Sequence, residues 1–132
     1  MHAADFDRLV ADACERIPAR FRRRLKNVAI MVEAEPNAGQ LARGRVPGGG
    51  TLLGLYEGRP LPQRSVFESF AMPDRITVFQ GPHERMARGP EHLAKLVADT
   101  VWHEVAHYFG LNEREVRAAE RRRPGHSRYG VK

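Results

Sequence analysis

Cysteine is almost absent from this chain of 132 residues, in which Cys14 is the only one. A single cysteine excludes an intramolecular disulfide and a metal cluster built from several cysteines of one chain. Long apolar runs are missing too, since none approaches the roughly 20 residues of a membrane-spanning helix. The first residues, MHAADFDRLVADACERIPARFRRRLK, mix acids and bases and do not fit a signal peptide. From these absences we expect a cytoplasmic protein without a membrane partner.

Positive charge is in excess. The chain has 22 Lys and Arg against 16 Asp and Glu, which gives a formal net charge of +6. Basic clusters gain affinity for nucleic acid by displacing counterions from phosphates. The two densest clusters, 20–26 and 121–128, match no helix-turn-helix or zinc-finger spacing. A basic nucleic-acid adaptor is therefore kept only as the weaker alternative function.

The length fits one domain, and we interpret residues 1–132 as a single one. Residues 36–50, PNAGQLARGRVPGGG, hold two prolines and five glycines and offer little apolar surface to bury. Ordering such a segment costs conformational entropy that burial does not offset, so a flexible loop is predicted there. Residues 124–132 are interpreted as a tail.

Hydrophobic periodicity predicts a helix near each end of the domain. Apolar residues recur at steps of three and four from Phe6 to Phe21, which predicts an amphipathic helix with Asp5 as its N-cap. Pro18 is expected to kink or divide this helix, because proline removes a backbone donor. A second helix is predicted over 91–109, and its second half is apolar nearly all round, as in a buried central helix. Gly110 is expected to end it.

Three strands are predicted between these helices. The alternation of β-branched and apolar residues over 27–35 predicts a strand inside the sheet. Two further strands are predicted over 51–58 and 74–81, each bracketed by glycine and proline turn signals. The intervening residues 59–73 are interpreted as a long loop or a wide hairpin.

The pattern with the clearest chemistry is HEVAH, which begins at His103. His103 and His107 are four residues apart, so on a helix they share one face and can direct both imidazoles at one metal ion. Glu104 lies beside them and can reach a water bound to that metal. A single histidine on an apolar face is more often a hydrogen-bonded core residue. Two histidines and a glutamate on a buried helix would be costly without an ion to pair them, which favours a metal site.

A catalytic zinc needs a third protein ligand and leaves its fourth position to water. Gly110 allows a sharp turn after the helix, and Glu113 could then bring a carboxylate back to the metal. Two histidines and a glutamate form a ligand set known for hydrolytic zinc. Iron, cobalt and nickel also accept imidazole and carboxylate, so the residues alone do not fix the metal.

Three blocks of the sequence, LGLYEGRPL, PDRITVFQGPHER and VWHEVAHYFGLNEREV, resemble the small bacterial zincin-like metallopeptidases, or minimal zincins, over about residues 28–117. The resemblance implies an α+β zincin-like fold, in which a small mixed sheet packs against an N-terminal helix and a central helix that bears the motif. It also assigns His103 and His107 as Zn²⁺ ligands and Glu104 as the general base on a zinc-bound water. Glu113 falls where the family more often has aspartate and where the metzincins have a third histidine.

The function implied is a zinc-dependent peptidase that acts on a peptide or protein substrate. We separately expect a monomer. No methionine follows Met86, so the methionine turn of metzincins is absent. By analogy with zincins, the strand that ends at Phe79 is expected to form the edge along which an extended substrate pairs. The candidates for stabilising the oxyanion are Tyr56, Tyr108, Tyr129 and His126, of which Tyr108 is the most readily explained as a core residue.

An alternative from another class is a metal-stabilised binding module without proteolytic activity. The same histidines could hold zinc structurally, with a fourth ligand such as His126 closing the site. A chain this short also has few residues from which to build the walls of a substrate pocket.

Overall fold

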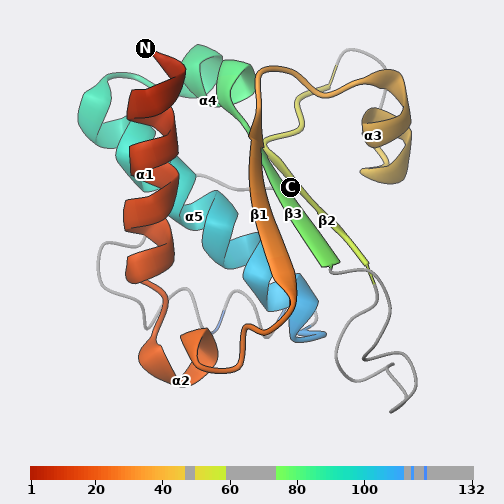
Figure 1. Ribbon diagram of the computed structural model, residues 1–132. Helices are drawn as coiled ribbons and strands as arrows, with labels where there is room; N and C mark the ends of the chain where they lie inside the picture. The colour runs from red at the N-terminus through yellow and green to blue at the C-terminus, as the bar shows by residue number, and fades with distance from the viewer. Residues whose placement is uncertain (47–49, 59–73, 112–113, 115–117, 119–132) are drawn as a thin grey trace.

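The fold is mixed α+β, with one small sheet and helices on both of its sides (Figure 1). The computed structural model describes residues 1–46, 50–58, 74–111, 114 and 118. The predicted fold class is confirmed, because the sheet packs against an N-terminal helix and a central helix that bears the motif. The elements are α1 (Ala3–Glu15), α2 (Ala19–Arg22), β1 (Val28–Glu33), α3 (Ala38–Arg43), β2 (Gly54–Glu57), β3 (Asp74–Phe79), α4 (Gln80–Met86) and α5 (Pro90–Tyr108).

The sheet has the strand order β1-β3-β2. β1 runs parallel to β3 with Ile30 opposite Ile76, and β2 runs antiparallel to β3 with Tyr56 opposite the same residue. β3 is therefore the central strand, and Arg75 is its only exposed residue. The sheet is mixed, as predicted.

Two predictions about the strands are wrong. The strand predicted over 27–35 lies at an edge of the sheet and not inside it. The strand that ends at Phe79 is paired on both sides, so it is not an edge open to a substrate. Alternation of apolar residues indicates that one face of a strand is buried, but it carries no information about which strands lie beside it.

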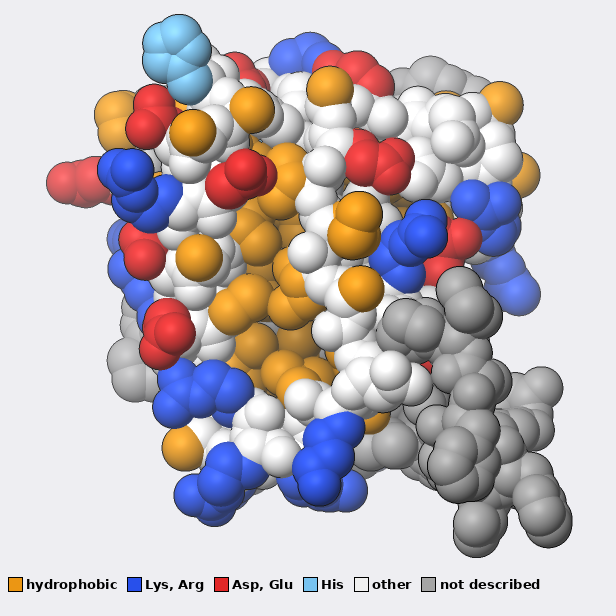
Figure 2. Space-filling view, in the orientation of Figure 1, with side chains coloured by type: hydrophobic (Ala, Val, Ile, Leu, Met, Phe, Trp, Pro, Cys, Tyr) orange, Lys and Arg blue, Asp and Glu red, His pale blue; other side chains and the backbone are white. Residues whose placement is uncertain are grey.

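The main core lies between the sheet and the helix pair α1 and α5. Ile76 and Val78 of β3 face Val97, Val101 and Val105 of α5, and all five are completely buried. Burial of each such side chain contributes about 1.5–3 kcal/mol relative to exposure. Hydrophobic side chains gather between α1 and β1, with charged side chains around them (Figure 2). This core fixes the position of α5 against the sheet.

The first helix ends earlier than its apolar pattern. α1 stops at Glu15, and Pro18 is the N-cap of the short helix α2, so proline divides the segment as predicted. His2, and not Asp5, is the N-cap residue of α1. Asp5 lies in the first turn, where a carboxylate interacts favourably with the helix dipole.

A helix, α3, occupies part of the segment for which a flexible loop was predicted. Asn37 and Gln40 form a capping box, in which the Gln40 N–H donates to Asn37 Oδ1 at 2.8 Å and the Asn37 N–H donates to Gln40 Oε1 at 2.9 Å. Gln40 also donates to Glu33 of β1 at 3.1 Å. The capping residues are a local helix signal inside a segment that is otherwise rich in glycine and proline. Residues 47–49, the predicted loop 59–73 and the predicted tail 124–132 lie outside the described residues.

The helix α4 follows β3 directly and was not predicted. Its His83 is completely buried, with Nδ1 donating to the Phe79 carbonyl at 2.7 Å and Nε2 at 2.7 Å from Thr100 Oγ1 of α5. Arg85 donates two hydrogen bonds of 2.8 Å to Glu35 after β1. These contacts join α4 to both α5 and the sheet. Within the described part of the chain, no helix is long and apolar enough to cross a membrane.

Candidate metal centre

Two histidines meet on one face of α5, at the end of the helix nearest its C-terminus. The ring centroids of His103 and His107 are 4.7 Å apart, with their planes at 70°. His103 is only 4% exposed and Glu104 only 3%, whereas His107 is half-buried. The helical spacing therefore places the three side chains as the sequence predicts, with the second imidazole nearest to solvent.

The end of α5 is set by Gly110, as predicted. Gly110 has φ 74°, a conformation that favours glycine. Its N–H donates to the His107 carbonyl at 2.9 Å, and the Leu111 N–H donates to the Ala106 carbonyl at 3.1 Å. These two bonds form a Schellman motif, which turns the chain away from the helix axis directly after the second histidine.

Gly54 of β2 brings the edge strand unusually close to the motif. A Cβ at residue 54 would lie 2.6 Å from Thr100 Cγ2 and 3.2 Å from Glu104 Cγ. Only glycine therefore allows β2 to pack this near to α5. Gly54 was predicted only as part of a strand, although a glycine inside a strand often marks a close approach.

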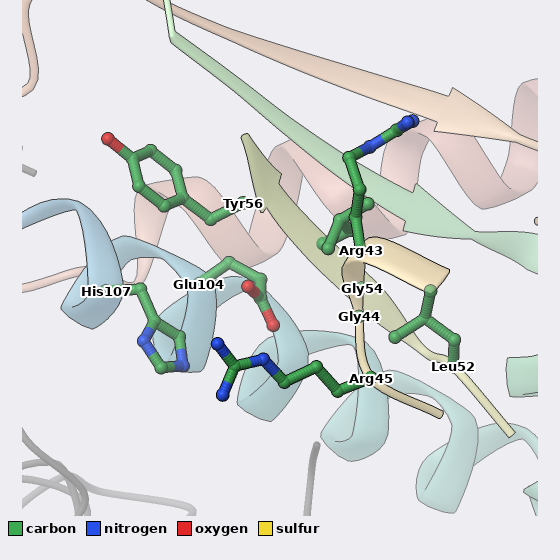
Figure 3. A pocket seen from close by; sticks show the side chains of 9 residues that line it. Arg43, Gly44, Arg45, Leu52, Gly54, Tyr56, Glu104 and His107 are labelled. Carbon is green, nitrogen blue, oxygen red and sulfur yellow. The ribbon is translucent and has the colours of Figure 1, made fainter. Parts of the chain in front are cut away.

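A cavity of about 250 Å³ opens beside this contact. Glu104 and His107 line one side of it, and the side chains of the α3–β2 segment line the other (Figure 3). Its remaining walls come from Arg43, Gly44, Arg45, Leu52, Gly54, Leu55 and Tyr56. The predicted base and one predicted ligand thus face the same cavity.

The two described tyrosines among the oxyanion candidates differ in position. Tyr108 is 1% exposed and its hydroxyl donates to the Lys26 carbonyl at 3.1 Å, so it is a core residue. Tyr56 lines the cavity, and its hydroxyl donates to the buried carboxylate of Asp74. The Tyr56 ring, rather than its hydroxyl, therefore faces the space beside Glu104 (Figure 3). Tyr129 and His126 lie outside the described residues.

The donor set at α5 fits a divalent transition metal as far as it is described. Two adjacent imidazoles are ligands that zinc favours, and a carboxylate beside them matches the arrangement of hydrolytic sites. No group of three or more His, Cys, Asp or Glu side chains that could hold an ion occurs in the described ranges. Glu113, the predicted third ligand, lies outside those ranges.

The basic cluster at 20–26 makes contacts within the domain. The Arg20 guanidinium lies 4.9 Å from the centroid of the Phe21 ring, and that of Arg24 lies 5.2 Å from the Phe109 ring. Arg22 donates to the Glu15 carbonyl at 2.7 Å. Two of these arginines, Arg20 and Arg24, thus lie over aromatic rings at this end of the core.

One known protein family matches most of this chain. A family model described as zincin-like metallopeptidase matches residues 25–123. The chain belongs to this family. Among solved structures, a conserved hypothetical protein from Thermus thermophilus is similar, with 28% identity and a TM-score of 0.52 over 83% of this chain and 94% of the other. No curated protein matches the chain at a significant level.

Membership in the zincin-like metallopeptidase family bears on the choice of ligands. The matched range contains the whole of α5 and also Glu113, whereas His126 and Tyr129 lie beyond its end. The part of the chain that resembles the family therefore includes the predicted base and all three predicted ligands. At the level of the family, this places the protein among those associated with metal-dependent peptide hydrolysis.

Proposed function

We propose that this zincin-like protein is a zinc-dependent peptidase. In this proposal His103 and His107 hold the metal, Glu113 completes the ligand set and Glu104 is the general base. The observation that carries it is that Glu104 and His107 line one cavity at the edge of the sheet (Figure 3). A base and a ligand that line one cavity can act on the same substrate bond.

The chemistry assigned to the protein side chains is proton transfer. When bound, zinc supplies the Lewis acidity that makes water a nucleophile near neutral pH and polarises a peptide carbonyl. Glu104 accepts a proton from the attacking water and returns it to the nitrogen of the leaving amine. Its burial in the cavity wall keeps bulk water from screening this charge.

The substrate is proposed to lie along β2. This strand pairs with β3 on one side only, and no described strand lies on its other side. An extended peptide can add to such an edge through backbone hydrogen bonds. Because Gly54 brings β2 against Glu104, a peptide bound there passes beside the proposed base. The edge strand proposed to pair with the substrate is therefore β2, and not β3 as predicted from the sequence.

The test replaces Glu104 by Gln and measures two quantities. Zinc-loaded wild-type protein should release new amino termini from a mixed peptide library, and Glu104→Gln should lower this rate by about 100-fold or more. Bound zinc, measured by elemental analysis, should stay the same in both. Glu84→Gln on α4 is the control and should change neither quantity. Equal hydrolysis by wild type and Glu104→Gln would contradict the proposal.

A second candidate is a metal-stabilised binding module, which the small size of the cavity favours. At about 250 Å³, the cavity is below the roughly 300–1,000 Å³ of typical small-molecule sites. For such a module zinc would raise the melting temperature, but the wild type would cleave no peptide in the library. The two functions therefore predict opposite results in the same experiment.

A further inference from the structure

Arg45 has a backbone conformation that arginine rarely adopts. Its φ is 56°, in the left-handed region, directly after α3. The Arg45 N–H donates to the Ala42 carbonyl and the Val46 N–H donates to the Leu41 carbonyl, both at 3.1 Å, which forms a Schellman motif. Glycine is the usual residue at this position, because it has no side chain to strain. Strained non-glycine residues concentrate at functional sites, so the Arg45 side chain is a candidate for a role.

The strained position directs the Arg45 side chain into the cavity. Figure 3 shows its guanidinium pointing toward Glu104 and His107 from the opposite wall. Arg43 lines the same cavity, but its Nε lies 2.7 Å from the Glu57 carboxylate and is paired there. Within the described part of the chain, no carboxylate is paired with Arg45. Of the two arginines that line the cavity, Arg43 therefore has a carboxylate partner, and Arg45 has none among the described residues.

We propose that Arg45 binds a carboxylate of the substrate and so determines which peptides enter the site. This inference rests on the proposed function, since it names a substrate class for the same cavity. The planar guanidinium matches a carboxylate through two parallel hydrogen bonds. Leu52 and Leu55 line the same cavity, and Arg45 is exposed, so a carboxylate arriving from solvent can reach its guanidinium.

The size of the cavity limits where this carboxylate lies in the peptide. Arg45 and Glu104 face each other across about 250 Å³. An extended chain advances about 3.3–3.6 Å per residue, so a cavity this small spans about one or two residues between the carboxylate and the bond beside Glu104. The carboxylate is either the free C-terminus of a peptide or an Asp or Glu side chain close to the scissile bond. Both sources present the same group to Arg45.

The experiment measures binding, so that its result does not depend on catalysis. The protein is the zinc-loaded full chain with Glu104→Gln, which is not expected to cleave the probes. The probes are three N-acetylated pentapeptides: alanine with a free C-terminus, the same peptide ending in an amide, and the amide form with one interior Glu. At least one carboxylate peptide should bind about 10-fold tighter than the neutral amide, as expected for a charge-assisted pair. The probe that binds tighter identifies the source of the carboxylate.

The decisive variant is Arg45→Gln in the Glu104→Gln background. It should reduce the preference for carboxylate peptides to about 2-fold or less. Arg43→Gln is the control and should keep most of the preference, because Arg43 is already paired with Glu57. Equal binding of all three probes would overturn the inference. So would a preference that survives Arg45→Gln, because the carboxylate would then contact another group such as the metal. Hydrolysis by the wild type is measured separately. A protein that cleaves peptides without this preference would refute the proposed role of Arg45 but not the proposed peptidase activity.

Discussion

The backbone of Gly54 lies so close to Glu104 that a Cβ at residue 54 would be 3.2 Å from Glu104 Cγ. This contact between the edge strand and the motif-bearing helix sets the distance from the proposed base to any peptide on β2. The nearest obstacle to a side chain there is Thr100 Cγ2, at 2.6 Å. The position of Glu104 thus depends on the absence of a side chain at residue 54, which lies on a strand far from Glu104 in the sequence.

Gly54→Ala should destabilise the domain by about 1–3 kcal/mol, because it overpacks a contact that has no space to relax. Urea unfolding followed by circular dichroism measures this change. Thr100→Ser removes the obstructing methyl but keeps the hydroxyl near His83. The double variant should therefore recover part of the loss. If Gly54→Ala is as stable as wild type, β2 and α5 are not held at this separation.

His103→Ala and His107→Ala should each lose most of the bound zinc, because each removes one of the two proposed ligands on α5. The melting temperature of the zinc-loaded protein should fall as well, since an ion that binds only the folded state adds to its stability. Elemental analysis after dialysis measures the metal. His92→Ala is the matched control on the same helix and should retain it. Equal zinc in all three variants would refute the assignment.

The local features of the candidate site were predictable from the sequence. Helical spacing alone places His103 and His107 on one face, and Gly110 ends α5 with the positive φ that was expected. Both features depend on residues a few positions apart, which periodicity and capping rules describe.

The features that depend on distant segments were not predictable. The order of the strands depends on which strands pair in the folded chain. The alternation of apolar and polar residues in β1 or β3 carries no information about that pairing. The roles of Gly54 and Arg45 arise because β2 and the end of α3 face α5 across one cavity. A capping box at Asn37 could have revealed α3, since its signal is local.

His83 should make the fold sensitive to mild acid. Burial lowers the pKa of His83 from its ordinary value of 6.5, because it disfavours the charged imidazolium. The unfolded chain therefore binds a proton at a higher pH than the folded protein does. The contribution of the neutral histidine is complete above about pH 6.5 and is lost as the pH falls below that value. Urea unfolding at a series of pH values measures the slope, and His83→Gln should flatten it below about pH 6.5. An unchanged slope would show that other groups cause the acid response.

Glu113→Ala should weaken zinc binding by about 10- to 100-fold or more, if Glu113 is the third ligand. Glu113→Asp should retain part of the affinity, because aspartate has the same donor on a shorter arm. Gly110→Val should do comparable harm without touching a ligand, since a β-branched residue resists a φ of 74°. Competition with a chromophoric chelator measures each dissociation constant. Undiminished affinity in Glu113→Ala would move the third ligand to Glu120 or His126.

Arg45→Gly should change stability and substrate binding in opposite directions. Glycine relieves the left-handed strain after α3, so the free energy of unfolding should rise by about 0.5–1 kcal/mol. Arg43→Gly, two residues earlier and inside the helix, should instead lower it by about 1 kcal/mol. Thermal unfolding of the zinc-loaded proteins measures both changes. The more stable Arg45→Gly variant should at the same time lose its preference for carboxylate peptides. A residue retained only for folding would not give this combination, because replacing it would improve stability at no functional loss. A variant that is less stable than wild type would show that the side chain of Arg45, and not its backbone strain, dominates its effect on the fold.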